Sequence, residues 1–196
     1  MQTILTGIRS NSVLTLGNYL GAMLPMVRLA NKHSKDYNIN IFVPDLHSII
    51  SDVDGDLREN IIRTIKYYLA AGLKINENVH IYRQSYVPAH SELCWILNCI
   101  ATMGETSRMI QYKEKSKGQE SCNVGIFDYP ILMAADILLY DATYVPIGED
   151  QFQHIELTRN LAMRFNHRFG EIFTVPAKTA DQIKFMGVNE GIRIRD

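Results

Sequence analysis

The chain has 196 residues, of which 46% are hydrophobic and 21% charged, and its formal net charge is −1. This length suits one α/β domain with its own core and is short for two domains. The near-neutral charge argues against bulk electrostatic binding of nucleic acid, although it allows a local basic patch. No run approaches the ~20 apolar residues of a membrane span, and the N-terminus lacks a signal-peptide pattern.

The cysteines indicate a cytoplasmic protein. Cys94, Cys99 and Cys122 are odd in number and show no metal-ligand spacing. Free thiols in a reducing compartment are therefore expected, and no metal-ligating residues are predicted.

The first unit is predicted to be a strand, a loop and a helix. Gln2–Gly7 is a short apolar run that ends in glycine, and a polar loop follows from Ile8 to Val13. Thr15-Leu16-Gly17-Asn18 then opens a helix that continues through Ala30. Free N–H groups at such a helix start bind anions, but Thr, Gly and Asn are also common capping residues, so both interpretations stay open.

The next units repeat this design. The segment 40–45 is predicted to be a strand with Asp45 and His47 at its carboxyl end. His47 is interpreted either as a packing histidine or as a binding residue. Residues 57–73 are predicted to be an amphipathic helix, 79–83 a strand and 88–100 a helix. Strands that alternate with helices in this way predict a Rossmann-like, doubly wound α/β fold with a mostly parallel sheet and flanking helices.

Basic residues then gather between Met103 and Gly118, namely Arg108, Lys113, Lys115 and Lys117. Such a run is usually a solvated helix face. The alternative is a segment that meets phosphates.

A polar residue interrupts the next apolar helix. Tyr129, Met133, Asp136 and Tyr140 recur at the period of one helical stripe. A carboxylate on this stripe needs a buried donor, because an unpaired one costs several kcal/mol or takes up a proton. That donor is either a neighbouring protein group or the N–H of a ligand.

A strand over 144–147 and a glycine turn, Gly148-Glu149-Asp150-Gln151, are predicted next, before a helix that begins near Gln151. Acidic residues at a helix start are explained by capping alone, but in an open α/β sheet ligands also bind at this turn. After Phe173 the segments 182–186 and 192–194 are predicted to be short strands.

Four motifs together resemble the bacterial-type tryptophanyl-tRNA synthetases, from Met1 to about Pro176. The motifs are Thr15-Leu16-Gly17-Asn18, Asp45-Leu46-His47, Tyr129-Pro130 through Met133-Ala134-Ala135-Asp136-Ile137-Leu138, and Gly148-Glu149-Asp150-Gln151. The resemblance implies a catalytic domain of class I type that binds ATP and tryptophan.

The resemblance also implies roles for individual residues. Its catalytic positions match Thr15, Asn18, Lys113 and Lys115. Its ATP positions match Gly7, Arg9, Gly17, Asn18, Gly148 and Asp150. Its amino-acid pocket matches Leu5, His47, Tyr129, Met133, Asp136, Val145, Ile147 and Gln151. In this family the carboxylate corresponding to Asp136 accepts the indole N–H.

The sequence departs from the family pattern at two places. The first loop reads Gly7-Ile8-Arg9-Ser10-Asn11-Ser12, where the family usually has a Pro-Ser/Thr-Gly turn. The Lys-Met-Ser-Lys-Ser loop and the anticodon-binding helical domain are expected beyond Asp196, so residues 1–196 are interpreted as a truncated catalytic domain.

The implied activity is that of a tryptophan–tRNA ligase. It would use ATP and Mg²⁺ to form tryptophanyl-adenylate and pyrophosphate and would transfer the amino acid to tRNA(Trp). A different class I-like nucleotidylyltransferase and a non-catalytic tryptophan- or nucleotide-binding module are the alternatives. A homodimer without a membrane partner is also expected, because many apolar residues lie between positions 67 and 100: Tyr67, Tyr68, Leu69, Leu73, Leu93, Trp95, Ile96, Leu97 and Ile100.

Overall fold

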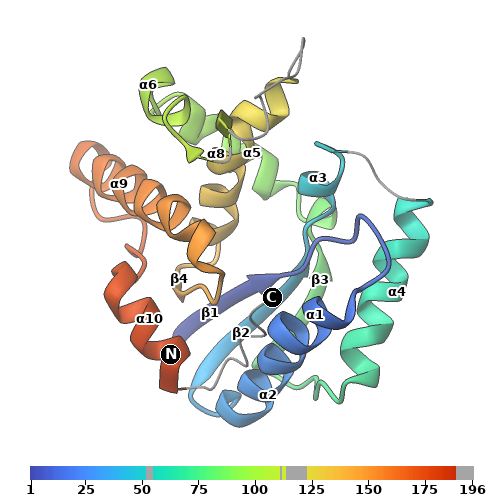
Figure 1. The fold of residues 1–196 in the computed structure, drawn as a ribbon. Helices are drawn as coiled ribbons and strands as arrows, with labels where there is room; N and C mark the ends of the chain where they lie inside the picture. Colours follow the sequence, from blue (N-terminus) through green and yellow to red (C-terminus); the bar gives the residue numbers. More distant parts are fainter. Residues whose placement is uncertain (52–54, 111, 114–122, 189–196) are drawn as a thin grey trace.

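The computed structural model describes residues 1–51, 55–110, 112–113 and 123–188. Its centre is a parallel sheet flanked by helices on both faces (Figure 1). The strands are β1 (Gln2–Gly7), β2 (Tyr37–Val43), β3 (Val79–Arg83) and β4 (Ala142–Tyr144). This arrangement confirms the predicted α/β class.

The helical segments fall between and after these strands. They are α1 (Leu16–Asn18), η1 (Tyr19–Met23), α2 (Leu24–His33), α3 (Asp45–Ser48), α4 (Leu57–Ala70), η2 (Gln84–Tyr86), α5 (Ala89–Asn98), α6 (Met103–Thr106), α8 (Val124–Leu138), η3 (Glu149–Gln151), α9 (Phe152–Phe169) and α10 (Thr179–Val188). The first three form one continuous helical segment, in which η1 is a π-helical turn.

The strand order in the sheet is β3-β2-β1-β4. The chain therefore builds outward from β1 through β2 to β3 and then returns to add β4 on the other side of β1. Both neighbours of β1 are parallel to it, with Gln2 opposite Tyr37 and Thr3 opposite Ala142. The carboxyl ends of β1 and β4 thus meet at a topological switch point, where open α/β sheets bind ligands.

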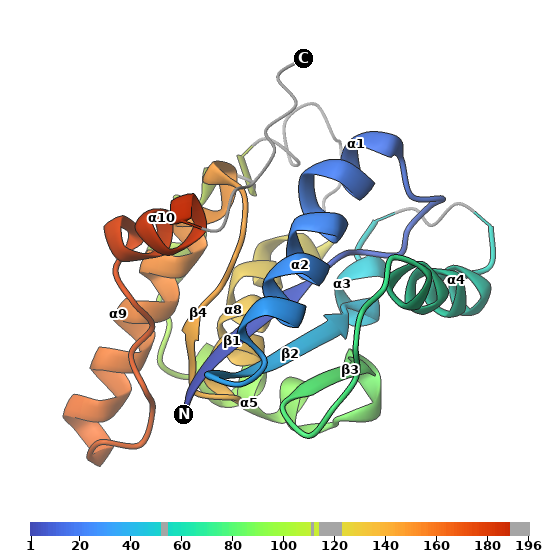
Figure 2. The same cartoon turned by 90° about the horizontal axis from the view of Figure 1, so that it is seen from below.

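The two faces of the sheet bury different side chains of the same strand. Ile4 packs with Ile39, Ile41 and residues of α2 in one core, whereas Leu5 packs with Ile137 of α8 in another. Figure 2 shows α2 and α8 on opposite sides of β1. Strand β1 is therefore buried on both faces, and even its polar residues Thr3 and Thr6 are only 8% and 7% exposed.

A third core joins three helices away from the sheet. Leu97 of α5, Ala134 of α8 and Leu161 of α9 are buried together. The short helix α6 is joined to these helices by Glu105, which accepts hydrogen bonds from Arg164 of α9 at 3.0 and 2.5 Å. Glu105 also completes a capping box with Thr102 at the start of α6. The bonds from Arg164 and Thr102 outweigh burial and lower the pKa of Glu105 from its ordinary 4.5 to about 2.

We expect Glu105→Gln to lower the free energy of unfolding by about 1–3 kcal/mol at neutral pH, because a charge-assisted pair is lost. A carboxyl group whose pKa is depressed in the folded state stabilises above its unfolded pKa and loses that contribution as the pH falls. The difference between parent and variant should therefore shrink from about pH 4.5 to about pH 2. Urea unfolding across this range measures it. A difference that does not vary with pH would contradict the ion-pair explanation, and Glu77→Gln, at an exposed position, is the control.

Two strand predictions have shifted bounds. The predicted strand 40–45 is β2, which ends at Val43, because Pro44 breaks the ladder and Asp45 begins α3. The predicted strand 144–147 is β4, which ends at Tyr144. Val145, Pro146 and Ile147 form a loop instead, and this loop lines the cavity described below.

The predicted strand over 182–186 is wrong, because these residues lie in α10. Gln182, Phe185 and Met186 are the more buried residues there, and their spacing of three and four is that of a helix. Phe185 stacks on Tyr144 with ring centroids 4.1 Å apart. Gln182 is fully buried and bonds to the backbone of Thr143 and Val145. The predicted strand 192–194 lies outside the described residues.

Within the ranges that the structure describes, no helix combines the length and the apolar character needed to cross a membrane. Cys94 and Cys99 are free thiols, and Cys122 lies outside those ranges.

Candidate active site

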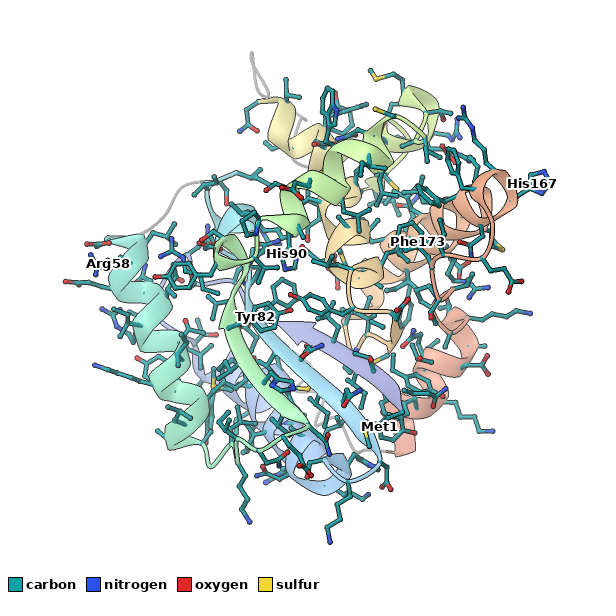
Figure 3. The ribbon with its side chains drawn as sticks, turned by 180° about the vertical axis from the view of Figure 1, so that it is seen from behind. Met1, Arg58, Tyr82, His90, His167 and Phe173 are labelled. Carbon is teal, nitrogen blue, oxygen red and sulfur yellow. The ribbon has the colours of Figure 1, made fainter. Side chains whose placement is uncertain are left out.

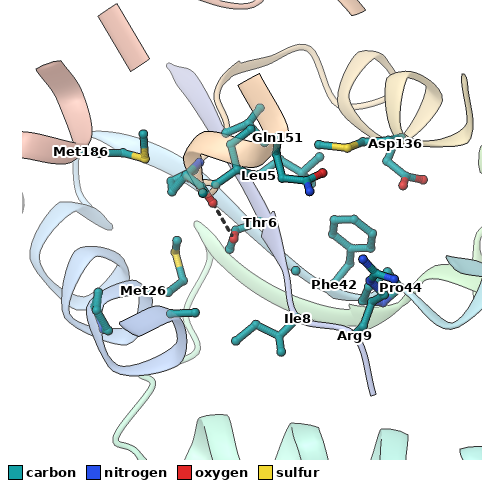
Figure 4. Close-up of a pocket in the computed structure, with 18 of the residues that line it drawn as sticks. Leu5, Thr6, Ile8, Arg9, Met26, Phe42, Pro44, Asp136, Gln151 and Met186 are labelled. Atoms are coloured by element: carbon teal, nitrogen blue, oxygen red, sulfur yellow. Dashed lines mark hydrogen bonds between the residues drawn. The ribbon is translucent and has the colours of Figure 1, made fainter. Parts of the chain in front are cut away.

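A cavity of about 980 Å³ opens at the carboxyl ends of the strands. Figure 4 shows β1 between Met26, on one side of it, and Asp136 on the other. The wall is formed by the end of β1 with the loop after it, by the N-terminal helix, by the loop after β4 and by α8, with α10 at the far edge. Cavities of this volume hold ligands of the size of a nucleotide or larger. The cavity thus lies at the topological switch point of the sheet.

Two glycines allow the chain to approach closely at this place. A Cβ atom on Gly7 would lie 2.6 Å from the backbone oxygen of Phe42. A Cβ atom on Gly148 would lie 2.5 Å from Oδ1 of Asp150. Because real Cβ atoms do not approach so closely, a larger residue at position 7 would shift the end of β1, whereas one at position 148 would displace the side chain of Asp150.

Thr15 is the N-cap of the helix that faces the cavity. Its Oγ1 accepts from the backbone N–H of Asn18 at 3.1 Å. The side chain of Asn18 is exposed and makes no capping bond. The N–H groups of Leu16 and Gly17 come before the first intrahelical bond and remain available to an anion.

Asp136 is the centre of a buried hydrogen-bond network on the α8 wall. Its carboxylate is 1% exposed and lines the cavity. Oδ2 lies 2.8 Å from Nε2 of His47, in α3. Oδ1 accepts from Nε2 of Gln84 at 2.7 Å and lies 2.6 Å from Nδ1 of His90. Three donors from three other elements thus converge on one carboxylate.

These donors also decide the ionisation of Asp136. Burial alone would raise its pKa, but the bonds from His47 and His90 outweigh burial and hold the pKa of Asp136 below its ordinary range. An ionised carboxylate bonded to His47 is therefore present in the wall, on the same helix as the apolar lining residues Met133 and Ile137. His47 is itself buried, and its Nδ1 has no hydrogen-bond partner among the described residues.

The remaining polar groups of the wall lie near Tyr129. The guanidinium of Arg9 lies 5.5 Å from the centroid of the Tyr129 ring, and His47 meets the same ring edge-on at 4.7 Å. The Tyr129 hydroxyl donates to Oε1 of Gln151 at 3.5 Å, and Nε2 of Gln151 donates to Asp150. Among the described lining residues, Arg9 is the one side chain that is always cationic.

The structure brings most of the predicted site residues together. Those that line the cavity are Leu5, Gly7, Arg9, Gly17, His47, Tyr129, Met133, Asp136, Val145, Ile147, Gly148 and Gln151. Thr15, Asn18 and Asp150 adjoin lining residues in the chain but do not line the cavity themselves. Lys113 is exposed and also outside the wall, and Lys115 lies outside the described residues.

Sequence reasoning missed Gln84 and His90, the two donors behind the wall. Gln84 directly follows β3, so its place at the carboxyl end of a strand was a usable signal. His90 carries no such signal, because it lies inside the first turn of an ordinary amphipathic helix.

Comparison with known proteins agrees with this geometry. The family model described as tRNA synthetases class I (W and Y) matches residues 1–189. A tryptophan–tRNA ligase of Caldanaerobacter subterraneus is 50% identical over 177 residues, which is 90% of this chain and 53% of the relative. One of Bacillus subtilis is 45% identical over 195 residues, which is 98% of this chain and 58% of the relative. The chain therefore spans little more than half the length of these relatives.

Solved structures give the same result. The tryptophanyl-tRNA synthetase of Campylobacter jejuni complexed with ADP and tryptophan matches with a TM-score of 0.80 and 37% identity, over 90% of this chain and 54% of that one. A tyrosyl-tRNA synthetase of Archaeoglobus fulgidus, complexed with L-tyrosine, matches with a TM-score of 0.68 and 19% identity, over 89% and 53%. That second likeness shows a shared fold only.

Proposed function

The chain belongs to the class I tRNA synthetases of the tryptophan and tyrosine group, and on that premise we propose that it is the catalytic part of a tryptophan–tRNA ligase. The observation that carries the choice of tryptophan is Asp136, an ionised carboxylate in the wall of the cavity, on the same helix as the apolar lining residues Met133 and Ile137. An indole ring needs apolar surroundings together with one acceptor for its N–H. The relatives that are 37–50% identical are tryptophan enzymes.

The proposed reaction joins two anions. A carboxylate oxygen of tryptophan attacks the α-phosphorus of ATP, and the bond from that phosphorus to the bridging oxygen of pyrophosphate breaks. The products are tryptophanyl-adenylate and pyrophosphate. A ribose hydroxyl of tRNA then loses its proton and attacks the carbonyl carbon of the adenylate, and the bond from that carbon to the phosphate oxygen breaks to release AMP. No side-chain nucleophile is required, so positioning and charge stabilisation supply the catalysis.

The nucleotide would occupy the side of the cavity formed by Gly7, Arg9, Gly17 and Gly148. The N–H groups at the helix start bind phosphate well, and the Arg9 guanidinium offsets the repulsion between the carboxylate and the α-phosphate. ATP would enter as its magnesium complex. In the described part of the chain no three His, Cys, Asp or Glu side chains are grouped to hold a metal, so the phosphates would carry the ion.

The amino acid would occupy the α8 side. The indole would lie between Leu5, Met133 and the Val145–Ile147 loop, with its N–H toward Asp136. The ammonium group of the substrate needs acceptors, and the Tyr129 hydroxyl with Oε1 of Gln151 supplies them. This arrangement directs the carboxylate of the amino acid toward Arg9.

Tryptophan-dependent exchange of pyrophosphate into ATP tests the proposal. Exchange with tryptophan, and far less with tyrosine or phenylalanine, is the expected result. Tryptophan binding without any exchange would favour the non-catalytic binding module instead. Exchange that depends on another carboxylate substrate would favour a different nucleotidylyltransferase and overturn the assignment.

Asn18 and Thr15 form a matched pair for the nucleotide side. Asn18→Ala should weaken ATP binding about tenfold and leave tryptophan binding and thermal stability unchanged, because its exposed side chain makes no capping bond. Thr15→Ala should instead lower stability by about 1 kcal/mol, because it removes the helix cap. Calorimetric titration and thermal unfolding measure both. An Asn18→Ala protein that loses stability and both ligands together would contradict this division of roles.

A homodimer is proposed through the surface that carries Tyr86, Trp95 and Ile96. These side chains are 76%, 72% and 47% exposed, and a dimer interface would bury them. Light scattering at micromolar concentration should give twice the monomer mass, and Trp95→Lys should shift it toward the monomer. A parent protein that is strictly monomeric would refute this proposal.

Transfer to tRNA(Trp) in the cytoplasm completes the proposed activity. The relatives, named tryptophan–tRNA ligases, are nearly twice this length, so recognition of the tRNA is proposed for the whole protein.

A further inference from the structure

Gln84 and His90 lie behind the cavity wall, where they cannot touch a ligand. Both are fully buried, and neither is among the residues that line the cavity. They come from η2 and α5, and Figure 3 shows His90 at the start of α5, near Tyr82 of β3. Their polar groups nevertheless converge on Oδ1 of Asp136, at 2.7 and 2.6 Å. Their effect on a ligand must therefore pass through that carboxylate.

The orientation of Gln84 is fixed by a second bond. Its Oε1 accepts from the backbone N–H of Leu46 at 3.1 Å. Since an amide presents its oxygen on one side and its NH₂ group on the other, Nε2 of Gln84 must face Asp136 as a donor. The alternative orientation would place two oxygens against each other at 2.7 Å.

His90 is likewise held at both ring nitrogens. Nδ1 meets Asp136, and Nε2 lies 3.2 Å from the hydroxyl of Tyr140. The ring also packs against Phe42, with centroids 6.1 Å apart and planes 23° apart. His90 thus has little freedom to move away from Oδ1.

The two donors fill one oxygen of the carboxylate and leave the other partly open. An ionised carboxylate offers about four acceptor sites, two on each oxygen. Gln84 and His90 take both sites of Oδ1, and His47 takes one site of Oδ2. Among the residues that the structure describes, no other donor takes the second acceptor site of Oδ2, and Asp136 lines the cavity.

We propose that Gln84 and His90 are positioning residues that fix the Asp136 carboxylate so that its one remaining acceptor site serves a ring N–H, and that they thereby set the preference for indole over rings without an N–H. The proposal rests on the proposed function, in which Asp136 faces the amino-acid side chain. It extends the specificity site beyond the cavity wall, to two residues that contact no substrate.

The experiment compares two ligands of nearly equal shape. One is tryptophan, and the other is 3-(benzothiophen-3-yl)alanine, in which sulfur replaces the indole N–H. Calorimetry on the full chain gives the ratio of their dissociation constants. The parent should prefer tryptophan by roughly a hundredfold or more, because a polar group built to bind an N–H rejects a ligand without one.

His90→Leu and Gln84→Met should each lower this ratio about tenfold, because each removes one donor to the carboxylate. The affinity for tryptophan should fall, and the affinity for the sulfur analogue should stay unchanged. His90→Asn should keep most of the ratio, because the Asn amide can donate from nearly the place of Nδ1. Thr64→Val is the matched control, since it removes a buried hydrogen bond to Asn60 far from Asp136, and its ratio should equal that of the parent.

Each outcome decides the proposal. If the variants weaken both ligands equally, or if His90→Asn behaves as His90→Leu does, these residues are only structural and the inference is overturned. Should His90→Leu fail to fold, Gln84→Met and His90→Asn decide the question by the same ratio. A parent protein that binds neither ligand refutes the proposed function itself, whereas a selective parent with unaltered variants refutes only this inference.

Discussion

Tryptophan binding should weaken by roughly a hundredfold or more when Asp136 is replaced by Asn. The substitution keeps the shape of the side chain but removes the charge and turns one acceptor into a donor. In the place of Oδ2 that NH₂ group would face both the indole N–H and the Nε2 hydrogen of His47. In the place of Oδ1 it would face the donors of Gln84 and His90. Phenylalanine has no ring N–H, so its binding should change far less, and the preference for tryptophan should collapse.

Stability must be measured beside affinity, because Asp136 also satisfies three buried donors. Removing the carboxylate with Asp136→Ala leaves those donors without a partner and should cost on the order of 3–5 kcal/mol. Asp45→Asn is the matched control for this effect. Asp45 is equally buried and accepts from Arg83 and Ser85, but it does not line the cavity. If Asp136→Asn behaves as Asp45→Asn does, losing stability but keeping its preference for tryptophan, Asp136 is purely structural.

The sheet could be predicted from the sequence because its information is local. Short segments that combine apolar and β-branched residues, each followed by a glycine or a polar residue and then a helix, define the order of elements without any structure. The positions of Gly7 and Gly148 followed from the same pattern. The bounds of β4 could not be predicted, because Val145 and Ile147 are as apolar as a strand although they form a loop on the cavity wall.

The site was predicted less completely, because its decisive contacts are not local. The stripe that carries Asp136 was visible in the sequence, but its partners Gln84 and His90 lie 52 and 46 residues away. No sequence pattern relates these positions to Asp136, and only the folded chain brings them together. The helix α10 was missed for a related reason. Its residue Phe185 is held by the ring of Tyr144 in β4, a contact that is distant in the sequence.

Residues 1–196 alone should bind tryptophan with normal affinity. Their rate of adenylate formation should nevertheless be two to three powers of ten lower than that of the same chain extended to the length of its relatives. Every residue proposed to contact the amino acid lies before Pro176, so recognition needs nothing further along the chain. In the class I family that this chain resembles, a Lys-Met-Ser-Lys-Ser loop brings positive charge onto the pyrophosphate. Such charge acts chiefly in the transition state, so its loss lowers turnover more than binding.

The expected loss of rate is estimated from the cost of removing a charge contact to the pyrophosphate. Removing one preorganised charge contact commonly costs on the order of 3–4 kcal/mol. Arg9 stays in the wall, so some activity should persist. The measurement is tryptophan-dependent ATP–pyrophosphate exchange, for residues 1–196 and for these residues joined to the C-terminal part of the Bacillus subtilis relative. In the extended chain, alanine at the loop lysines should return the rate to that of residues 1–196 without altering tryptophan affinity. Equal rates for the short and extended chains would instead mean that Arg9 and the helix start stabilise the transition state unaided.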